Sequence, residues 1–250
     1  MPVGIDGSRR IVIERVYPEL DCGRYAVKRE VGDTLAVEAD IFKEGHEVIA
    51  AAIRYRPEVE AEWHEAPMRF IDNDRWGGTV RLERNCRYLF TIVAWTDGFG
   101  SWRTDLRKKH EAGQEVSSEL LEGAHLIERA IARSTGVDRD ALRDHLDTLE
   151  SAATPAERIL LVLSAELLEL MERNQAREDL TLYDRELPVQ VDRLRARFAA
   201  WYELFPRSMS DDAARHGTFD DVIAKLPYVR DMGFDVLYFP PIHPIGRSFR

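Results

Sequence analysis

GTFDDVIAKLPYVRDMGFDVLYF, residues 217–239, is the stretch that decides the fold class. Thr218 is predicted to cap a helix, with Asp221 as the carboxylate of a capping box. Gly233 is predicted to end this helix in the left-handed conformation, and Pro227 is expected to kink it. One side of the helix is predicted to carry Phe219, Val222, Ile223, Leu226 and Val229. DVLYF then follows as an apolar strand.

Another strand is expected before this helix. FAAWYELFPRS, residues 198–208, is predicted to be a buried strand that runs into a loop. Strand, helix and strand form a βαβ unit, whose strands should be parallel and whose crossover should be right-handed. Because such a pair leaves apolar faces and edges unpaired, we expect more strands to follow. Chemistry in parallel α/β folds lies at the carboxyl ends of strands, and PPIHPIGR, residues 240–247, is such an end.

Residues 8–97 have the period of strands. In TLAVEADIF, residues 34–42, apolar and acidic side chains alternate, and VIAAAIRYR, residues 48–56, repeats the alternation. Turn-forming residues separate these strands at residues 43–47 and 71–78. The pattern predicts an all-β, immunoglobulin-like sandwich.

From Asp105 to about Arg177 the period becomes helical. The clearest helix is predicted to open at Thr154 as N-cap, followed by Pro155 and by Glu157 as the capping-box residue. One face of this helix is predicted to carry Ile159, Leu163, Leu167 and Leu170. This face must pack against neighbouring helices or against a second subunit. After these helices, LPVQVDR, residues 187–193, is predicted to be an extended connector with a short strand.

Composition excludes several classes of function. The 250 residues include 45 acidic and 35 basic residues, for a formal charge of −10. This balance argues against nucleic acid or an anionic membrane as the main partner. No apolar run approaches the roughly 20 residues of a membrane helix, and the first residues lack a signal-peptide core, so we expect a cytoplasmic protein. Cys22 and Cys86 stand apart from other ligand-type residues, and the sequence predicts no metal, disulfide or cofactor.

Several segments resemble one family within the α-amylase superfamily, the bacterial α-1,4-glucan:maltose-1-phosphate maltosyltransferases. The resemblance covers essentially the whole chain, in the same order. Its most specific segments are GRYAVKREVGD at 23–33, NDRW at 73–76, WTDGFGSWRTDL at 95–106, AWYELFPRS at 200–208 and LPYVRDMGFDVLYFPPIHPIG at 226–246.

The resemblance implies a β-sandwich domain over residues 1–110 with a helical insertion over residues 111–186. A connector and the first βαβ of a (β/α)₈ TIM barrel would then occupy residues 187–250. It also implies a homodimer that assembles through the N-terminal domain. The implied reaction transfers maltosyl units from maltose 1-phosphate to the non-reducing end of an α-1,4-glucan, with retention. Since the superfamily carries its catalytic carboxylates on later barrel strands, none is expected within this chain, which on its own should be inactive.

Three residues are candidates for substrate binding. His243, at the presumed end of a strand, could contact sugar hydroxyls or phosphate, or could simply rigidify its loop. Arg247 and Arg250 could hold a phosphate with their guanidinium groups, although surface arginines are the commoner case.

Other polar and aromatic residues have structural interpretations. Trp76, Trp95 and Trp102 fit core anchors better than a platform for sugar rings. Glu203 within WYELF predicts an inward salt bridge. Asp97 and Arg103 are candidates for an ion pair at the start of the helical region.

Two alternatives to the maltosyltransferase remain open at this stage. The first is another α-amylase-family enzyme, such as a trehalose synthase or a branching enzyme. The second is a non-catalytic carbohydrate-binding or dimerisation module. Binding of maltooligosaccharides without turnover would favour the module.

Overall fold

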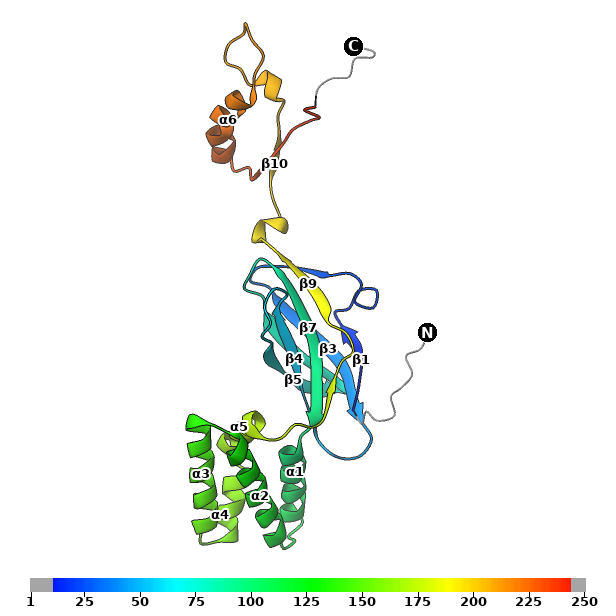
Figure 1. The fold of residues 1–250 in the computed structure, drawn as a ribbon, viewed down its shortest axis with the longest axis vertical. Coiled ribbons are helices and arrows are strands. Elements are labelled where there is room, and N and C mark those ends of the chain that lie inside the picture. The colour runs from blue at the N-terminus through cyan, green and yellow to red at the C-terminus, as the bar shows by residue number, and fades with distance from the viewer. Residues whose placement is uncertain (1–10, 244–250) are drawn as a thin grey trace.

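The computed structural model describes residues 11–243 and has an elongated shape (Figure 1). A bundle of helices lies at one end, a large β-sheet lies in the middle, and a small unit of two strands and a helix lies at the other end. None of the helices within the described residues combines the length and the apolar character needed to cross a membrane.

The central sheet contains strands that precede the helical bundle in the sequence and strands that follow it. Its strands are β1 (Ile11–Tyr17), β2 (Val27–Glu30), β3 (Thr34–Lys43), β4 (Ile49–Pro57), β5 (His64–Asp72), β6 (Arg75–Arg81), β7 (Arg87–Thr96), β8 (Glu178–Leu182) and β9 (Leu187–Asp192). Their order is β1-β3-β6-β5-β4-β7-β9-β2, and β8 pairs with β7. All pairings are antiparallel except that of β2 with β9.

One hydrophobic core lies inside this sheet. In β3 the alternation seen in the sequence places Leu35, Val37, Ala39 and Ile41 in the core, each at most 1% exposed. The same core contains residues of β1, β4, β6, β7 and β9. Because strands from distant positions in the sheet share one core, the sheet must curl around it. The predicted all-β character of this region is confirmed.

Strand β9 is the short strand predicted within residues 187–193, and the structure shows that it belongs to the central sheet. Leu187, Val189 and Val191 are almost fully buried in the core of the sheet. The strand pairs with β7 on one side and with β2 on the other. The alternation of apolar residues in LPVQVD is the period of a half-buried strand, and the connector begins only after Asp192.

The helical bundle comprises α1 (Gly98–Glu111), α2 (Ser117–Arg133), α3 (Gly136–Ser151), α4 (Pro155–Val162) and α5 (Ala165–Asn174). The predicted capping box is present, because Thr154 Oγ1 accepts from the Glu157 N–H at 3.3 Å and Glu157 Oε2 accepts from the Thr154 N–H at 3.0 Å. The single helix expected after Thr154 is in fact two. Helix α4 ends at Val162, and Ser164 caps α5 by accepting from the Leu167 N–H.

Arg103 of α1 stabilises the break between α4 and α5. Its guanidinium donates to the carbonyl oxygens of Leu163 and Ser164, the two residues at the interruption. The predicted ion pair between Arg103 and Asp97 is therefore wrong. Asp97 instead caps α1, accepting from the Gly100 N–H at 2.8 Å.

The tryptophans are core anchors, as the sequence favoured. Trp95 and Trp102 are only 6% and 7% exposed. Trp102 packs so closely on α2 that a Cβ on Gly123 would lie 2.3 Å from its ring. Trp76 is partly buried against the sheet core and donates to the Ile41 carbonyl at 3.1 Å. Buried rings of this kind cannot serve as an exposed platform for sugars.

A polar junction joins the start and the end of the helical bundle. Asp97, at the end of β7, accepts from Gln175 Nε2 at 2.8 Å, and Gln175 Oε1 accepts from the Phe99 N–H at 3.1 Å. Ser101 Oγ donates to the Asp97 carbonyl and accepts from the Val48 N–H, both at 2.7 Å. These bonds hold together the two points at which the chain leaves and re-enters the sheet.

The small unit at the other end confirms the predicted parallel βαβ. It contains β10 (Trp201–Glu203), α6 (Phe219–Asp231) and β11 (Val236–Tyr238), with the short helices η1 (Leu194–Ala196) and η2 (Pro206–Ser208) before and after β10. The two strands are parallel. Thr218 and Asp221 form the expected capping box, and Gly233 has a φ of 88°. Helix α6 buries Val222 and Val229 against the strands.

Strand β10 is more exposed than its sequence predicts. Tyr202 and Leu204 face α6, whereas Trp201 on the opposite face is 63% exposed. Glu203 is also exposed, so its predicted inward salt bridge is wrong. On α6, Phe219, Ile223 and Leu226 of the predicted apolar side are exposed as well. Trp201 and Glu203 are exposed because, within the described residues, the two-stranded sheet is covered by a helix on one face only.

Arginines of the connector tie this unit to the sheet. Arg197 donates to Glu30 Oε2 at 2.9 Å and to Asp33 Oδ1 at 2.5 Å, beyond the end of β2. The backbone N–H of Glu30 and the Arg197 guanidinium lower the pKa of Asp33 to about 2. At the other side of the connector, Arg195 pairs with Asp235 at 2.8 Å, just before β11.

We predict that Asp97→Ala destabilises the junction of sheet and bundle. The variant loses a helix cap and leaves the amide of Gln175 without its acceptor, which together should lower the free energy of unfolding by about 2 kcal/mol. The measurement is urea denaturation followed by circular dichroism. The matched control is Asp105→Ala, an exposed aspartate of the same helix whose ion pair with Lys108 should contribute little. Equal stability of the two variants would contradict the prediction.

Candidate functional site

A groove lies at the carboxyl ends of β10 and β11, where parallel α/β folds place their chemistry. Its volume is about 480 Å³, which lies within the usual range for small-molecule sites. The segments after both strands and the start of α6 contribute the lining residues, which are Phe205, Pro206, Arg207, His216, Gly217, Thr218, Phe219, Pro240, Pro241, Ile242 and His243.

The loop from η2 to α6 forms one wall of the groove, and Gly217 allows it to close. The Gly217 N–H donates to the Arg207 carbonyl at 2.7 Å. A Cβ at residue 217 would lie 2.2 Å from the Pro206 carbonyl oxygen and 2.8 Å from the backbone nitrogens of Met209 and Ser210. Only glycine fits this close approach of two backbone segments.

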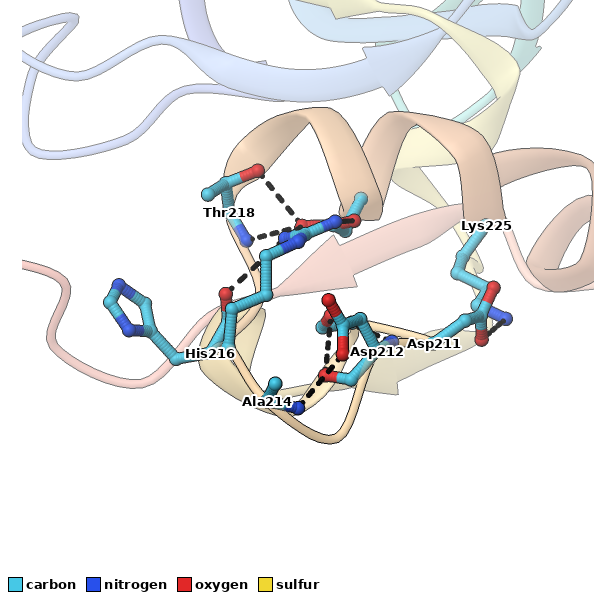
Figure 2. Close-up of polar contacts among 9 residues, drawn as sticks. Asp211, Asp212, Ala214, His216, Thr218 and Lys225 are labelled. Carbon is cyan, nitrogen blue, oxygen red and sulfur yellow. Dashed lines mark hydrogen bonds and ion pairs between the residues drawn. The ribbon is translucent and has the colours of Figure 1, made fainter.

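A network centred on Asp221 fixes the same loop to α6 (Figure 2). The two terminal nitrogens of the Arg215 guanidinium, Nη1 and Nη2, donate to the two carboxylate oxygens of Asp221, each at 2.7 Å. The Oδ2 atom of Asp221 also accepts from the Thr218 N–H at 2.7 Å and from its hydroxyl at 2.9 Å. Arg215 and the Thr218 N–H hold the pKa of the Asp221 carboxyl well below its usual range.

Three further hydrogen bonds pin the loop nearer its start, and all are drawn in Figure 2. Lys225 of α6 donates to Asp211 at 2.8 Å. Asp212 Oδ1 accepts from the Ala214 N–H at 2.8 Å, and the Asp212 N–H donates to Ser210 Oγ at 3.0 Å. The loop is therefore held by side chains and backbone along its whole length, although it contains no regular secondary structure between η2 and α6.

The chemistry available in the groove is that of binding. Arg207, His216 and His243 supply donors for phosphate or hydroxyl oxygens, while Phe205 and Phe219 supply apolar faces. No carboxylate belongs to the lining within the described residues, so the pair of acids that glycosyl transfer requires is not found there. Residues 11–243 also contain no group of three or more His, Cys, Asp or Glu side chains that could hold a metal ion.

The structure describes one of the three residues predicted to bind substrate. His243 is exposed and lines the groove. Arg247 and Arg250 lie outside the described residues. Sequence reasoning missed Arg207 and His216. The available signals were the position of Arg207 in the loop that follows the predicted strand, and the position of His216 two residues before the helix cap.

Comparisons with known proteins identify relatives along the whole chain. The family model described as domain N/S of alpha-1,4-glucan:maltose-1-phosphate maltosyltransferase matches residues 9–193. A protein with that enzyme name from Myxococcus xanthus is 46% identical over 248 residues, which cover 96% of this chain and 37% of the relative.

Two other relatives carry the same enzyme name. The one from Burkholderia pseudomallei is 47% identical over 250 residues, covering 97% of this chain and 22% of the relative. The one from Chlorobaculum tepidum is 44% identical over 245 residues, covering 98% and 36%. This chain therefore spans between 22% and 37% of the length of these three relatives.

We predict that Gly217→Ala opens the wall of the groove. The added Cβ would overlap the Pro206 carbonyl, so the loop must move at a cost on the order of 2 kcal/mol. Amide hydrogen exchange of residues 201–239 should become faster, while exchange in the central sheet stays unchanged. Gly98→Ala is the control, because a Cβ there meets nothing within 4 Å. Unchanged exchange in the Gly217 variant would refute the close approach.

Proposed function

Because the chain belongs to the α-1,4-glucan:maltose-1-phosphate maltosyltransferase family, we propose that it is the N-terminal part of such an enzyme. The complete enzyme would move maltosyl units from maltose 1-phosphate to the non-reducing end of α-1,4-glucans, in the cytoplasm. The observation that carries the proposal is the groove at the carboxyl ends of the parallel strands β10 and β11, in a chain that aligns with these relatives over almost its whole length.

We propose that the three parts of the structure are the parts that the family resemblance implies. We propose that the curled sheet is the immunoglobulin-like β-sandwich and that α1 to α5 are its helical insertion. The β10-α6-β11 unit is then the first βαβ of a (β/α)₈ barrel. The proposed division of the chain remains residues 1–110, 111–186 and 187–250, although α1 already begins at Gly98 and β9 belongs to the sheet.

The exposed face of β10 and β11 supports the barrel assignment. Trp201 and Tyr238 lie exposed on the face that α6 does not cover. Large apolar side chains on one face of a parallel pair require further strands or helices as cover. In a barrel, that face would point inward and pack against side chains from the remaining strands.

The proposed reaction proceeds with retention and needs two carboxyl groups. One attacks the anomeric carbon to form a glycosyl-enzyme intermediate, and the other assists departure of the leaving group. Phosphate is a better leaving group than a sugar alkoxide, so it needs less protonation but must be held in place. We propose His243, Arg247 and Arg250 as substrate-binding residues and expect both catalytic carboxylates beyond residue 250. No cofactor is needed for this chemistry.

We predict that residues 1–250 alone release no phosphate from maltose 1-phosphate, because the lining of the groove lacks the required carboxylates. The full-length protein should transfer maltosyl units to a maltooligosaccharide acceptor with stoichiometric release of phosphate. The measurement is a phosphate assay combined with chromatography of the glucan products. Phosphate release by residues 1–250 alone would contradict the proposal. It would also be contradicted if the full-length protein elongated the maltooligosaccharide acceptor with maltose as the donor and released no phosphate.

We also propose that the protein forms a homodimer through its N-terminal domain. Large apolar side chains are exposed on three helices of the bundle, namely Leu121 of α2, Val137 of α3 and Leu160 of α4. Such residues can contribute apolar area to an interface between subunits. Light scattering of the 28.8 kDa chain should give about twice that mass. A monomer at all accessible concentrations would contradict the dimer.

A further inference from the structure

We infer that Arg207 and His216 contact the phosphate oxygens of a phosphate monoester bound in the groove. This inference rests on the proposed function, because it names residues that hold the phosphate-bearing ligand in the same site. The ligand could be the donor maltose 1-phosphate or the free orthophosphate that its turnover releases. Neither residue emerged from the sequence, and both lie in the wall between η2 and α6.

The first argument is the charge of the lining. Within the described residues the groove is lined by one guanidinium and two imidazoles, and no Asp or Glu belongs to it. The chain as a whole carries a formal charge of −10. A groove without carboxylates on such an acidic protein avoids the repulsion that would otherwise oppose an anion. A guanidinium also matches phosphate oxygens in geometry as well as in charge.

The second argument is that the Arg207 guanidinium is uncommitted. Within the described residues no hydrogen bond or ion pair involves its side chain; only its backbone carbonyl is engaged, by Gly217. The groove at the opposite ends of the strands provides a contrast. That groove, of about 540 Å³, is lined by Arg193, Arg195 and Arg197.

Two of these three arginines are already neutralised by carboxylates. Arg195 pairs with Asp235, which also lines that groove, and Arg197 pairs with Glu30 and Asp33. An arginine that holds a structural carboxylate is poorly placed to bind a second anion. Arg193 has no such partner within the described residues, but the carboxylate of Asp235 also lines the larger groove and opposes an anion there, whereas no carboxylate lines the groove of Arg207.

The third argument is the rigidity of the wall that carries His216. Its two neighbours in the chain are both fixed, Arg215 by Asp221 and Gly217 by the Arg207 carbonyl. The imidazole itself is exposed and has no partner within the described residues, and Figure 2 shows it directed away from the Asp221 network. Because the backbone on both sides of His216 is already fixed, binding needs to order only the imidazole and not the loop.

The apolar part of the lining favours an organic phosphate over orthophosphate alone. Phe205, Phe219 and Ile242 contribute side chains to the groove. The ring of Phe219 contacts that of Phe239, with centroids 5.9 Å apart, which restrains its position. Aromatic and aliphatic faces suit the C–H faces of a sugar ring, so cations and apolar surface together match a sugar phosphate.

The test uses the full-length protein and its Arg207→Ala and His216→Ala variants. We expect Arg207→Ala to raise the KM for maltose 1-phosphate and the inhibition constant of orthophosphate by about tenfold or more, because a charge-assisted hydrogen bond is lost. His216→Ala should raise both by a smaller factor. Arg207→Lys should recover part of the loss. Thermal melting confirms that each variant is folded.

The matched control is Arg193→Ala, which removes an exposed arginine from the opposite groove. Both constants should stay unchanged in this variant. A rise confined to orthophosphate would assign the contact to the free anion, and a rise confined to maltose 1-phosphate would assign it to the donor. Unchanged constants in Arg207→Ala, or a rise in the KM of the acceptor glucan alone, would overturn the inference.

Calorimetry separates failure of this inference from failure of the proposed function. If the full-length protein lacks transferase activity, titration with maltose 1-phosphate and with orthophosphate still tests the groove. Binding that weakens in Arg207→Ala but not in Arg193→Ala supports the inference without the enzyme assignment. Absence of binding of both probes to the wild-type protein would overturn it.

Discussion

The pairing of β9 with both β7 and β2 is the interaction on which the arrangement of the three parts depends. Without β9, the edges of β7 and β2 would expose unpaired backbone groups, and the core would lose Leu187, Val189 and Val191. The pairing is also the most distant along the chain, since β2 begins at Val27 and β9 ends at Asp192. The helical bundle therefore has to return the chain to a fixed place on the sheet.

The hydrogen bonds of Gln175 to Asp97 and to the Phe99 N–H meet this requirement at the base of the bundle. They bring the last residue before α1 next to the first residue after α5, so the chain leaves and re-enters the sheet at one place, beside the end of β7. Closing a long loop costs entropy that grows only slowly with its length, and a few polar contacts at the neck are enough to fix it. The same logic applies at the other end of β9, where Arg197 holds the connector against Glu30 and Asp33.

The parts of the fold that the sequence predicted are those set by local pattern. Alternation in β3, the capping box at Thr154 and the left-handed Gly233 all depend on residues a few positions apart. The failures depend on tertiary partners. The break at Leu163 is stabilised by Arg103, sixty residues away, and the burial of β9 depends on β2. Likewise, the sequence predicted His243 as a binding residue from its position after a strand. Arg207 and His216 could be placed beside His243 only once the structure showed how the loop before α6 closes.

The shape of the groove depends on one small residue, Gly217. Gly217 lets the chain before α6 touch the chain after β10, and this contact places Arg207 and His216 along one wall. The Arg215–Asp221 pair stiffens the wall, but the guanidinium of Arg215 already pairs with this carboxylate and is not available for a ligand. Neighbouring residues therefore have different roles: Arg215 fixes the loop to α6, and the imidazole nitrogens of His216 stay available for a ligand. A site assembled this way before its ligand arrives converts more of the contact energy into affinity, because little is lost in ordering the loop.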